Sequence, residues 1–265
     1  VWTRAMDFAI PGESRLRAML PFADMFNHDP AFVAPNTVCH AFDVPRQTFI
    51  VRAGRDYKAG EQVCINYGAC GDMRMLRVYG FVLGPRDNEA ANSVDLYAPF
   101  SNMLPAFGDK EDIAKACGVK TQEPYPLTTA TPVPEGLLTS LRIQHLDEDE
   151  AKEAATGKGS IFDKLNGKKP VNSVMESSVV QALLGGVSGM LQAYPTTLAE
   201  DEAELDGLKI QEVEEAASGA GSEGLVTASS TDSRKRMALL MRIGEKEILQ
   251  KACDELAQKA ADTQD

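Results

Sequence analysis

Two short stretches of the sequence decide how its first part folds. The first is LPFADMFNH at residues 20–28, and the second is GEQVCINYG at residues 60–68. A third stretch, YGFV at residues 79–82, follows shortly after the second. Taken singly, each has an ordinary structural interpretation. An Asn-His pair can form a polar turn whose side chains cap backbone groups, and a tyrosine that ends a strand is usually a packing residue.

The residues around these stretches predict a β-rich first part. Residues 17–22, 48–53 and 61–67 are expected to be strands, because they are rich in β-branched and aromatic residues or alternate apolar with polar ones. A turn at residues 57–61 joins the last two, and Gly60 is free to take a positive φ there.

From about residue 109 the apolar residues recur at helical spacing. Ser173 and Glu176 form a capping-box pattern at the start of one helix, and Pro195 ends that helix. A Gly/Ser/Ala-rich flexible loop is expected at residues 216–230. The expected helices cover residues 109–119, 134–146, 173–194 and 233–261. The sequence therefore predicts an α+β protein with a β-rich first part and an all-α second part.

The charge of the chain is uneven. Residues 1–108 carry 10 Lys and Arg against 11 Asp and Glu, whereas residues 109–265 carry 17 against 28, within a total net charge of −12. Binding to nucleic acid depends on basic residues that meet phosphates, so no nucleic-acid partner is expected. A protein partner rich in Lys and Arg suits such a surface better.

Cysteine and histidine spacing argues against disulfides and metals. The five cysteines contain no CxxC pair, which suits a reducing, intracellular location without specifying the compartment. The three histidines show no HxH or HExxH spacing, so no metal site is expected, although Asp24, His28 and His40 are ligand-type residues. No apolar run approaches the roughly 20 residues of a membrane span, so no membrane partner is expected either.

The order of the motifs is more specific than any one of them. P-x-A-D-M-x-N-H, then G-E-x-x-x-x-x-Y-G, then Y-G-F, at these spacings, resembles the C-terminal half of SET domains. The resemblance is closest to the branch of Rubisco large-subunit methyltransferase (LSMT). TRAM (residues 3–6), YPTTLAED (194–201) and RIGEKEIL (242–249) also look like landmarks of this family. The resemblance implies a SET pseudoknot at residues 1–90 and a helical substrate-binding domain at residues 91–265.

The resemblance also implies a function. Members of this family are S-adenosylmethionine-dependent protein-lysine N-methyltransferases, so a monomeric enzyme that methylates lysine on a non-histone protein is expected. By motif position, Tyr67 is the catalytic residue. The matched cofactor-binding positions are Thr3, Asp24, Asn27, His28 and Tyr67. The matched substrate-binding positions are Arg4, Met6, Asp24 and Tyr79.

Several residues depart from the family pattern. The first cofactor loop of the family would lie before Val1, so the chain is expected to lack the N-terminal half of the SET domain and to be inactive alone. Cys70-Gly71-Asp72 replaces a usual Lys-Ser-Asn, and Met6 replaces a common aromatic residue. Two alternatives follow. One is a non-catalytic, protein-binding scaffold. The other is the branch that methylates a histidine of actin, which carries Asn and Trp where this chain has Met6 and Ala23.

Overall fold

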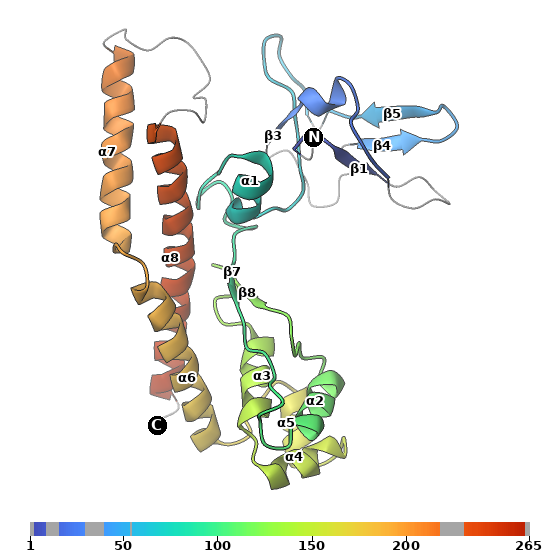
Figure 1. Ribbon diagram of the computed structural model, residues 1–265, viewed down its shortest axis with the longest axis vertical. Helices are drawn as coiled ribbons and strands as arrows, with labels where there is room; N and C mark the ends of the chain where they lie inside the picture. The colour runs from blue at the N-terminus through green and yellow to red at the C-terminus, as the bar shows by residue number, and fades with distance from the viewer. Residues whose placement is uncertain (1–2, 9–15, 30–39, 54, 218–230, 263–265) are drawn as a thin grey trace. The chain divides into compact units, whose positions relative to one another are not determined.

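The computed structural model describes residues 3–8, 16–29, 40–53, 55–217 and 231–262. The chain divides into two compact units, Val1–Ala91 and Asn92–Asp265. In its described residues the first unit is built from short strands, a 3-10 helix and one α-helix, and the second unit is mostly helical (Figure 1). The α+β fold class expected from the sequence is confirmed.

The described residues of the first unit form three two-stranded sheets. β1 pairs with β2 and β4 with β5, both antiparallel, whereas β3 and β6 are parallel although they are far apart in the sequence. The strands are shorter than the sequence predicted. The elements are β1 (Met6–Phe8), β2 (Leu16–Ala18), a 3-10 helix η1 (Ala23–Met25), β3 (Asn27–His28), β4 (His40–Asp43), β5 (Thr48–Val51), β6 (Cys64–Ile65) and α1 (Asp72–Tyr79).

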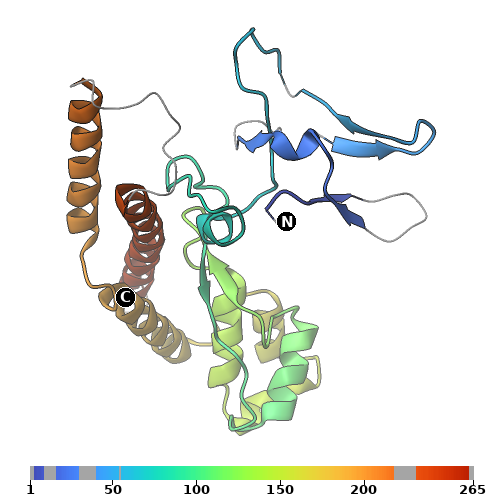
Figure 2. The ribbon, with the colours of Figure 1, turned by 45° about the horizontal axis from the view of Figure 1, so that its top comes forward.

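The second unit is a helical domain with one small sheet. β7 and β8 pair antiparallel. α8 packs along both α6 and α7, as Figures 1 and 2 show from two directions. The elements are β7 (Val94–Leu96), α2 (Phe107–Ala116), β8 (Tyr125–Leu127), α3 (Glu135–His145), α4 (Glu148–Ala155), α5 (Ser160–Asn166), α6 (Ser173–Gln192), α7 (Leu198–Ala217) and α8 (Thr231–Asp262).

The core of the second unit lies between α3, α6 and α8. Side chains such as Leu138, Val180 and Leu249 are fully buried there. A separate, smaller cluster of Leu205, Leu239 and Ile243 joins α7 to α8. The sequence did not predict α7. Its last residues, Ala216 and Ala217, belong to the expected loop, and the rest of that loop, residues 218–230, lies outside the described residues.

The expected capping box at Ser173 is wrong by one residue. Asn172 caps α6, because its side-chain Oδ1 accepts a hydrogen bond from the Met175 N–H at 2.8 Å. Glu176 instead forms a buried ion pair with Arg142 of α3, with Nη2–Oε1 and Nε–Oε2 distances of 2.6 and 2.7 Å. The pair therefore ties α6 to α3.

Within the described part of the chain, α6 has the length and apolar character of a membrane-crossing helix. The expectation that no segment approaches that length is therefore wrong. Val179, Val180 and Val187 of α6 are fully buried in the core of the helical unit. Core helices of this kind satisfy the same criterion, so the length of α6 does not by itself assign it to a membrane.

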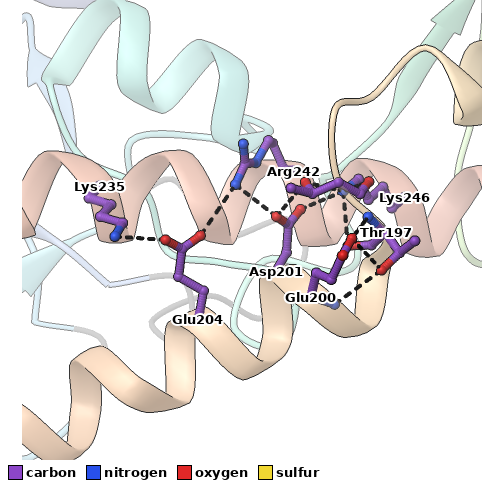
Figure 3. A network of polar contacts seen from close by, with 8 residues as sticks. Thr197, Glu200, Asp201, Glu204, Lys235, Arg242 and Lys246 are labelled. Carbon is purple, nitrogen blue, oxygen red and sulfur yellow. Dashed lines mark hydrogen bonds and ion pairs between the residues drawn. The ribbon is translucent and has the colours of Figure 1, made fainter.

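A buried polar network joins α7 to α8 (Figure 3). Lys246 of α8 is 1% exposed and Asp201 of α7 is fully buried, and Nζ donates to Oδ2 at 2.6 Å. Lys246 Nζ also donates to the Thr196 carbonyl at 2.6 Å, and Arg242 Nη2 donates to Asp201 Oδ1 at 2.7 Å. Burial alone would raise the pKa of Asp201, but the hydrogen bonds from Lys246 and Thr196 and the charge of Arg242 outweigh it and lower the pKa. The motifs at residues 194–201 and 242–249 thus contact each other.

Candidate active site

The site is built on the parallel pairing of β3 with β6. Asn27 lies opposite Cys64, and His28 lies opposite Ile65. The pairing continues one residue further, where the Asp29 N–H donates to the Ile65 carbonyl at 3.1 Å. Ile65 is buried and anchors the pair in the unit. The two stretches with which the sequence analysis began are therefore neighbours.

Tyr67 is held by two hydrogen bonds to the first stretch. Its backbone N–H donates to His28 Nδ1 at 3.0 Å, and its hydroxyl donates to the Phe26 carbonyl at 2.7 Å. Because Nδ1 accepts this hydrogen bond, the neutral His28 carries its own proton on Nε2. The rings of His28 and Tyr67 lie 5.1 Å apart between centroids. The hydroxyl proton of Tyr67 is thus engaged, while the lone pairs of its oxygen are left to accept.

Burial keeps both ring systems uncharged. It lowers the pKa of His28, since the imidazolium form loses hydration in the half-buried site. It raises the pKa of Tyr67, against a smaller opposing effect of the Arg4 charge. A neutral imidazole and a neutral phenol therefore face each other at physiological pH.

Two further aromatic rings complete this side of the site. The Tyr79 ring lies 4.7 Å from the Tyr67 ring, and the Phe81 ring lies 6.3 Å from His28 and 6.2 Å from Tyr79. Tyr79 is the last residue of α1, and Gly80 ends that helix in the left-handed region at φ 81°. This sharp turn allows Tyr79 and Phe81, on either side of Gly80, to contact the same group of rings.

Asp72 supports the loop that follows α1. Its buried carboxylate accepts hydrogen bonds from the backbone N–H groups of Leu83 and Gly84, both at 3.1 Å, and from Asn88 Nδ2 at 3.0 Å. This fixes the chain just after Phe81. From the sequence alone Asp72 was only a departure from the family pattern and Phe81 had no role, although both lie within the motifs. The Phe26 carbonyl leaves no signal in a sequence.

The remaining expected residues make other contacts. Arg4 Nη1 donates to the backbone carbonyl of Asp24 at 2.8 Å, so these two are brought together. Thr3 is exposed in a turn, and Met6 is half-buried in β1, opposite Ala18. The contacts described for Thr3 and Met6 do not join them to Tyr67. In the described ranges no three His, Cys, Asp or Glu residues are grouped as metal ligands.

The geometry predicts how His28 titrates. Its imidazole should protonate below the ordinary histidine pKa of about 6.5. Because the folded pKa is lowered, the unfolded chain binds the proton more readily. The stabilising contribution is therefore complete above about pH 6.5 and is lost as the pH falls through the folded pKa. Protonated Nδ1 also cannot accept from the Tyr67 N–H, so that amide resonance should shift in the same titration. An NMR titration in which the imidazole protonates above pH 6.5 would contradict this arrangement.

The fold and the site define a SET-type protein, and comparisons with known families agree. Residues 6–68 match the family model of the SET domain. Residues 101–249, more than half of the chain, match the family model described as Rubisco LSMT substrate-binding. The chain belongs to the family of proteins that carry this Rubisco LSMT substrate-binding domain, which confirms the resemblance stated from the motifs.

Individual relatives fall into two activities. The chain is 28% identical over 250 residues to the chloroplastic fructose-bisphosphate aldolase-lysine N-methyltransferase of Arabidopsis thaliana, covering 89% of this chain and 46% of that protein. It is 27% identical over 257 residues to the actin-histidine N-methyltransferase of Homo sapiens, covering 95% of this chain and 38% of that protein. The chain thus spans less than half the length of these curated relatives.

Two solved structures share the fold. One is the SET domain of LSMT bound to MeLysine and AdoHcy, with a TM-score of 0.74, 24% identity, and coverage of 98% of this chain and 54% of that chain. The other is Rubisco LSMT bound to AdoMet, with a TM-score of 0.70, 25% identity, and coverage of 93% and 51%. The helical second unit and the SET-like first unit are both included in these matches.

Proposed function

We propose that the protein containing this chain transfers a methyl group from S-adenosylmethionine to a lysine side chain of a non-histone protein. The observation that carries the proposal is the position of the Tyr67 hydroxyl, which is fixed by its 2.7 Å hydrogen bond to the Phe26 carbonyl. An oxygen held in this way presents lone pairs at one defined place. The Arabidopsis thaliana relative, which is named as a lysine N-methyltransferase, supports the assignment.

The residues at the site suit a cationic methyl donor. S-adenosylmethionine supplies a methyl group on a positively charged sulfur. The faces of the aromatic rings and the lone pairs of the Tyr67 oxygen attract such a charge, and neutral His28 does not repel it. On the basis of the motif positions, Thr3, Asp24, Asn27, His28 and Tyr67 would hold the donor.

Methyl transfer needs a neutral amine and a fixed line of attack. A lysine has a free pKa of about 10.4, and a half-buried aromatic site lowers that value because it disfavours a second positive charge. The Tyr67 oxygen can accept an N–H of the amine and so aim its lone pair at the methyl group. Positioning of this kind supplies much of the rate of a displacement reaction. Arg4, Met6, Asp24 and Tyr79 would line the lysine side.

Histidine methylation is the second candidate, since the similarity to actin-histidine methyltransferases is as high as that to the lysine enzyme. Lysine is preferred because this chain has Met6 and Ala23 where the histidine branch carries Asn and Trp.

The proposal also includes an intracellular location with the compartment left open, a monomeric state, and no nucleic-acid or membrane partner. A scaffold without chemistry is the remaining alternative.

One experiment distinguishes lysine methylation, histidine methylation and a scaffold without chemistry. The protein, expressed from its complete reading frame, is incubated with a proteome from the same source and with isotope-labelled S-adenosylmethionine. Amino-acid analysis of the hydrolysed products should find the label on methylated lysine. Label on methylhistidine would replace the proposal with the second candidate, and no protein-bound label would favour the scaffold.

A further inference from the structure

The helical unit carries a groove of about 450 Å³ between β7, α3 and α6. Apolar side chains form most of its lining, and Leu96, Leu141, Leu183 and Met190 contribute from all three elements. No charged residue other than Asp95 lines it. The groove lies wholly within the second unit, and none of its lining residues belongs to the Tyr67 cluster, which is formed by His28, Tyr67, Tyr79 and Phe81.

Gly186 of α6 keeps this groove open. Glycine in a helix interior lowers helix stability relative to alanine, because it loses more conformational freedom on folding. A Cβ added at Gly186 would meet no atom within 4 Å, so packing inside the chain does not require the glycine. The neighbouring Gly185 has the same free space but does not line the groove.

Asp95 gives the groove its chemical character. The carboxylate is exposed and makes no hydrogen bond or ion pair with the residues that the structure describes. Tyr97, two residues further, lines the same groove and is 64% exposed. An unpaired carboxylate and an aromatic ring above an apolar surface match a Lys or Arg side chain, whose apolar stem and charged head need both kinds of contact.

The charge of the whole unit favours the same partner. Residues 1–91 carry 10 Lys and Arg and 10 Asp and Glu, so they have no net charge. Residues 92–265 carry 17 against 29 and hold the entire net charge of −12. A second copy of this unit, or an anionic membrane, would be repelled, whereas a basic segment would be attracted.

We propose that this groove is a docking site for a basic, amphipathic segment of a partner protein. A Lys or Arg of that segment places its stem on Leu96 and Leu141 and its charged head between Asp95 and Tyr97. An adjacent apolar residue enters the groove beside Gly186. That the partner is the methylated protein rests on the proposed function, whereas docking is measurable without any methyl transfer.

The test uses a short fluorescein-labelled peptide of Leu, Lys and Arg, and a second peptide with Glu in place of every Lys and Arg. Binding to the full chain is followed by fluorescence anisotropy without S-adenosylmethionine. The basic peptide should bind and the acidic one should not, and added salt should weaken the binding. Gly186→Leu fills the groove and should reduce affinity about tenfold or more, as for other blocked pockets. Asp95→Asn should reduce it about two- to fivefold, the size expected of one exposed ion pair.

Gly185→Leu is the matched control, because it makes the same change one residue away, off the groove, and also has room for a side chain. It should leave affinity within about twofold of the parent, below the effect of one exposed ion pair. The proposal is overturned if the basic peptide does not bind, or if Gly186→Leu and Gly185→Leu have equal effects. It is also overturned if Gly186→Leu abolishes self-association or binding to phosphatidylcholine vesicles rather than peptide binding. None of these outcomes depends on catalysis, so a failed methyl-transfer assay leaves the docking result standing.

Discussion

Replacing Lys246 with methionine should destabilise the helical unit by about 3 to 5 kcal/mol. The substitution keeps most of the side-chain volume but removes the ammonium group that donates to Asp201 and to the carbonyls of Thr196 and Thr197. Lys246 is 1% exposed, so water does not take the place of its ammonium group. The cost comes mainly from leaving the buried Asp201 carboxylate without this partner, rather than from the strength of the ion pair itself. Urea unfolding followed by helical circular dichroism measures it.

Lys235→Met is the matched control on the same helix. Lys235 also pairs with a carboxylate of α7, that of Glu204, at 2.7 Å, but its side chain is 48% exposed. Exposed pairs contribute about 1 kcal/mol or less, so this variant should unfold almost like the parent. Adding Asp201→Asn to Lys246→Met removes both charges and should cost less than the sum of the single changes. Equal effects of the two lysine substitutions would show that burial does not decide the strength of this contact.

Replacing Tyr67 with phenylalanine should lower the rate of methyl transfer by about 10²- to 10³-fold, the usual effect of removing one preorganised polar group. The ring contacts with His28 and Tyr79 remain, and so does the backbone bond to His28 Nδ1. Only the hydroxyl and its bond to the Phe26 carbonyl are lost. Most of the reduction should fall in kcat, since the oxygen acts most strongly in the transition state. Single-turnover measurements with labelled S-adenosylmethionine separate this effect from binding.

Tyr57→Phe removes the same group from a tyrosine elsewhere in the first unit. The Tyr57 ring packs under Arg55, with the guanidinium carbon 4.1 Å from the ring centre, and this contact does not need the hydroxyl. Its turnover should match that of the parent. Near-normal turnover of Tyr67→Phe would rule out the catalytic role proposed for Tyr67, but it would not support a scaffold, because such a protein still transfers methyl groups.

The sequence predicted features that depend on local pattern. The helix expected at residues 134–146 is α3, and the one expected at residues 233–261 is α8, since apolar residues recur at helical spacing in both segments. α7 was missed, because its acidic residues and Gly207 obscure the few leucines that pack on α8. The cap of α6 was misplaced because Asn172 and Ser173 are both good capping residues, and Glu176 is used by Arg142 of another helix.

The motifs located the site, but its contacts required the structure. The order of the motifs predicted that His28 and Tyr67 lie together. No sequence pattern shows that the Tyr67 backbone N–H donates to His28 Nδ1 while the Tyr67 hydroxyl donates to the Phe26 carbonyl. Nor could the sequence show that Asp72 fixes the loop behind Phe81, because that bond depends on the turn after α1. Local sequence patterns do not encode contacts between two segments that are distant in the sequence.

The parallel pairing of β3 with β6 also has a consequence for the order in which the protein folds. Residues 29–63 must be closed into a loop before Asn27 can lie opposite Cys64, and the chain loses conformational freedom before that contact stabilises it. Each helix of the second unit can begin to form through contacts between residues close in the sequence, which is the faster kind of folding. Packing of α8 on α6, however, joins residues far apart in the sequence, such as Ser188 and Cys253. Single helices should therefore form before the pairing of β3 with β6 is complete. The proposed catalytic centre is expected to mature only after this loop has closed.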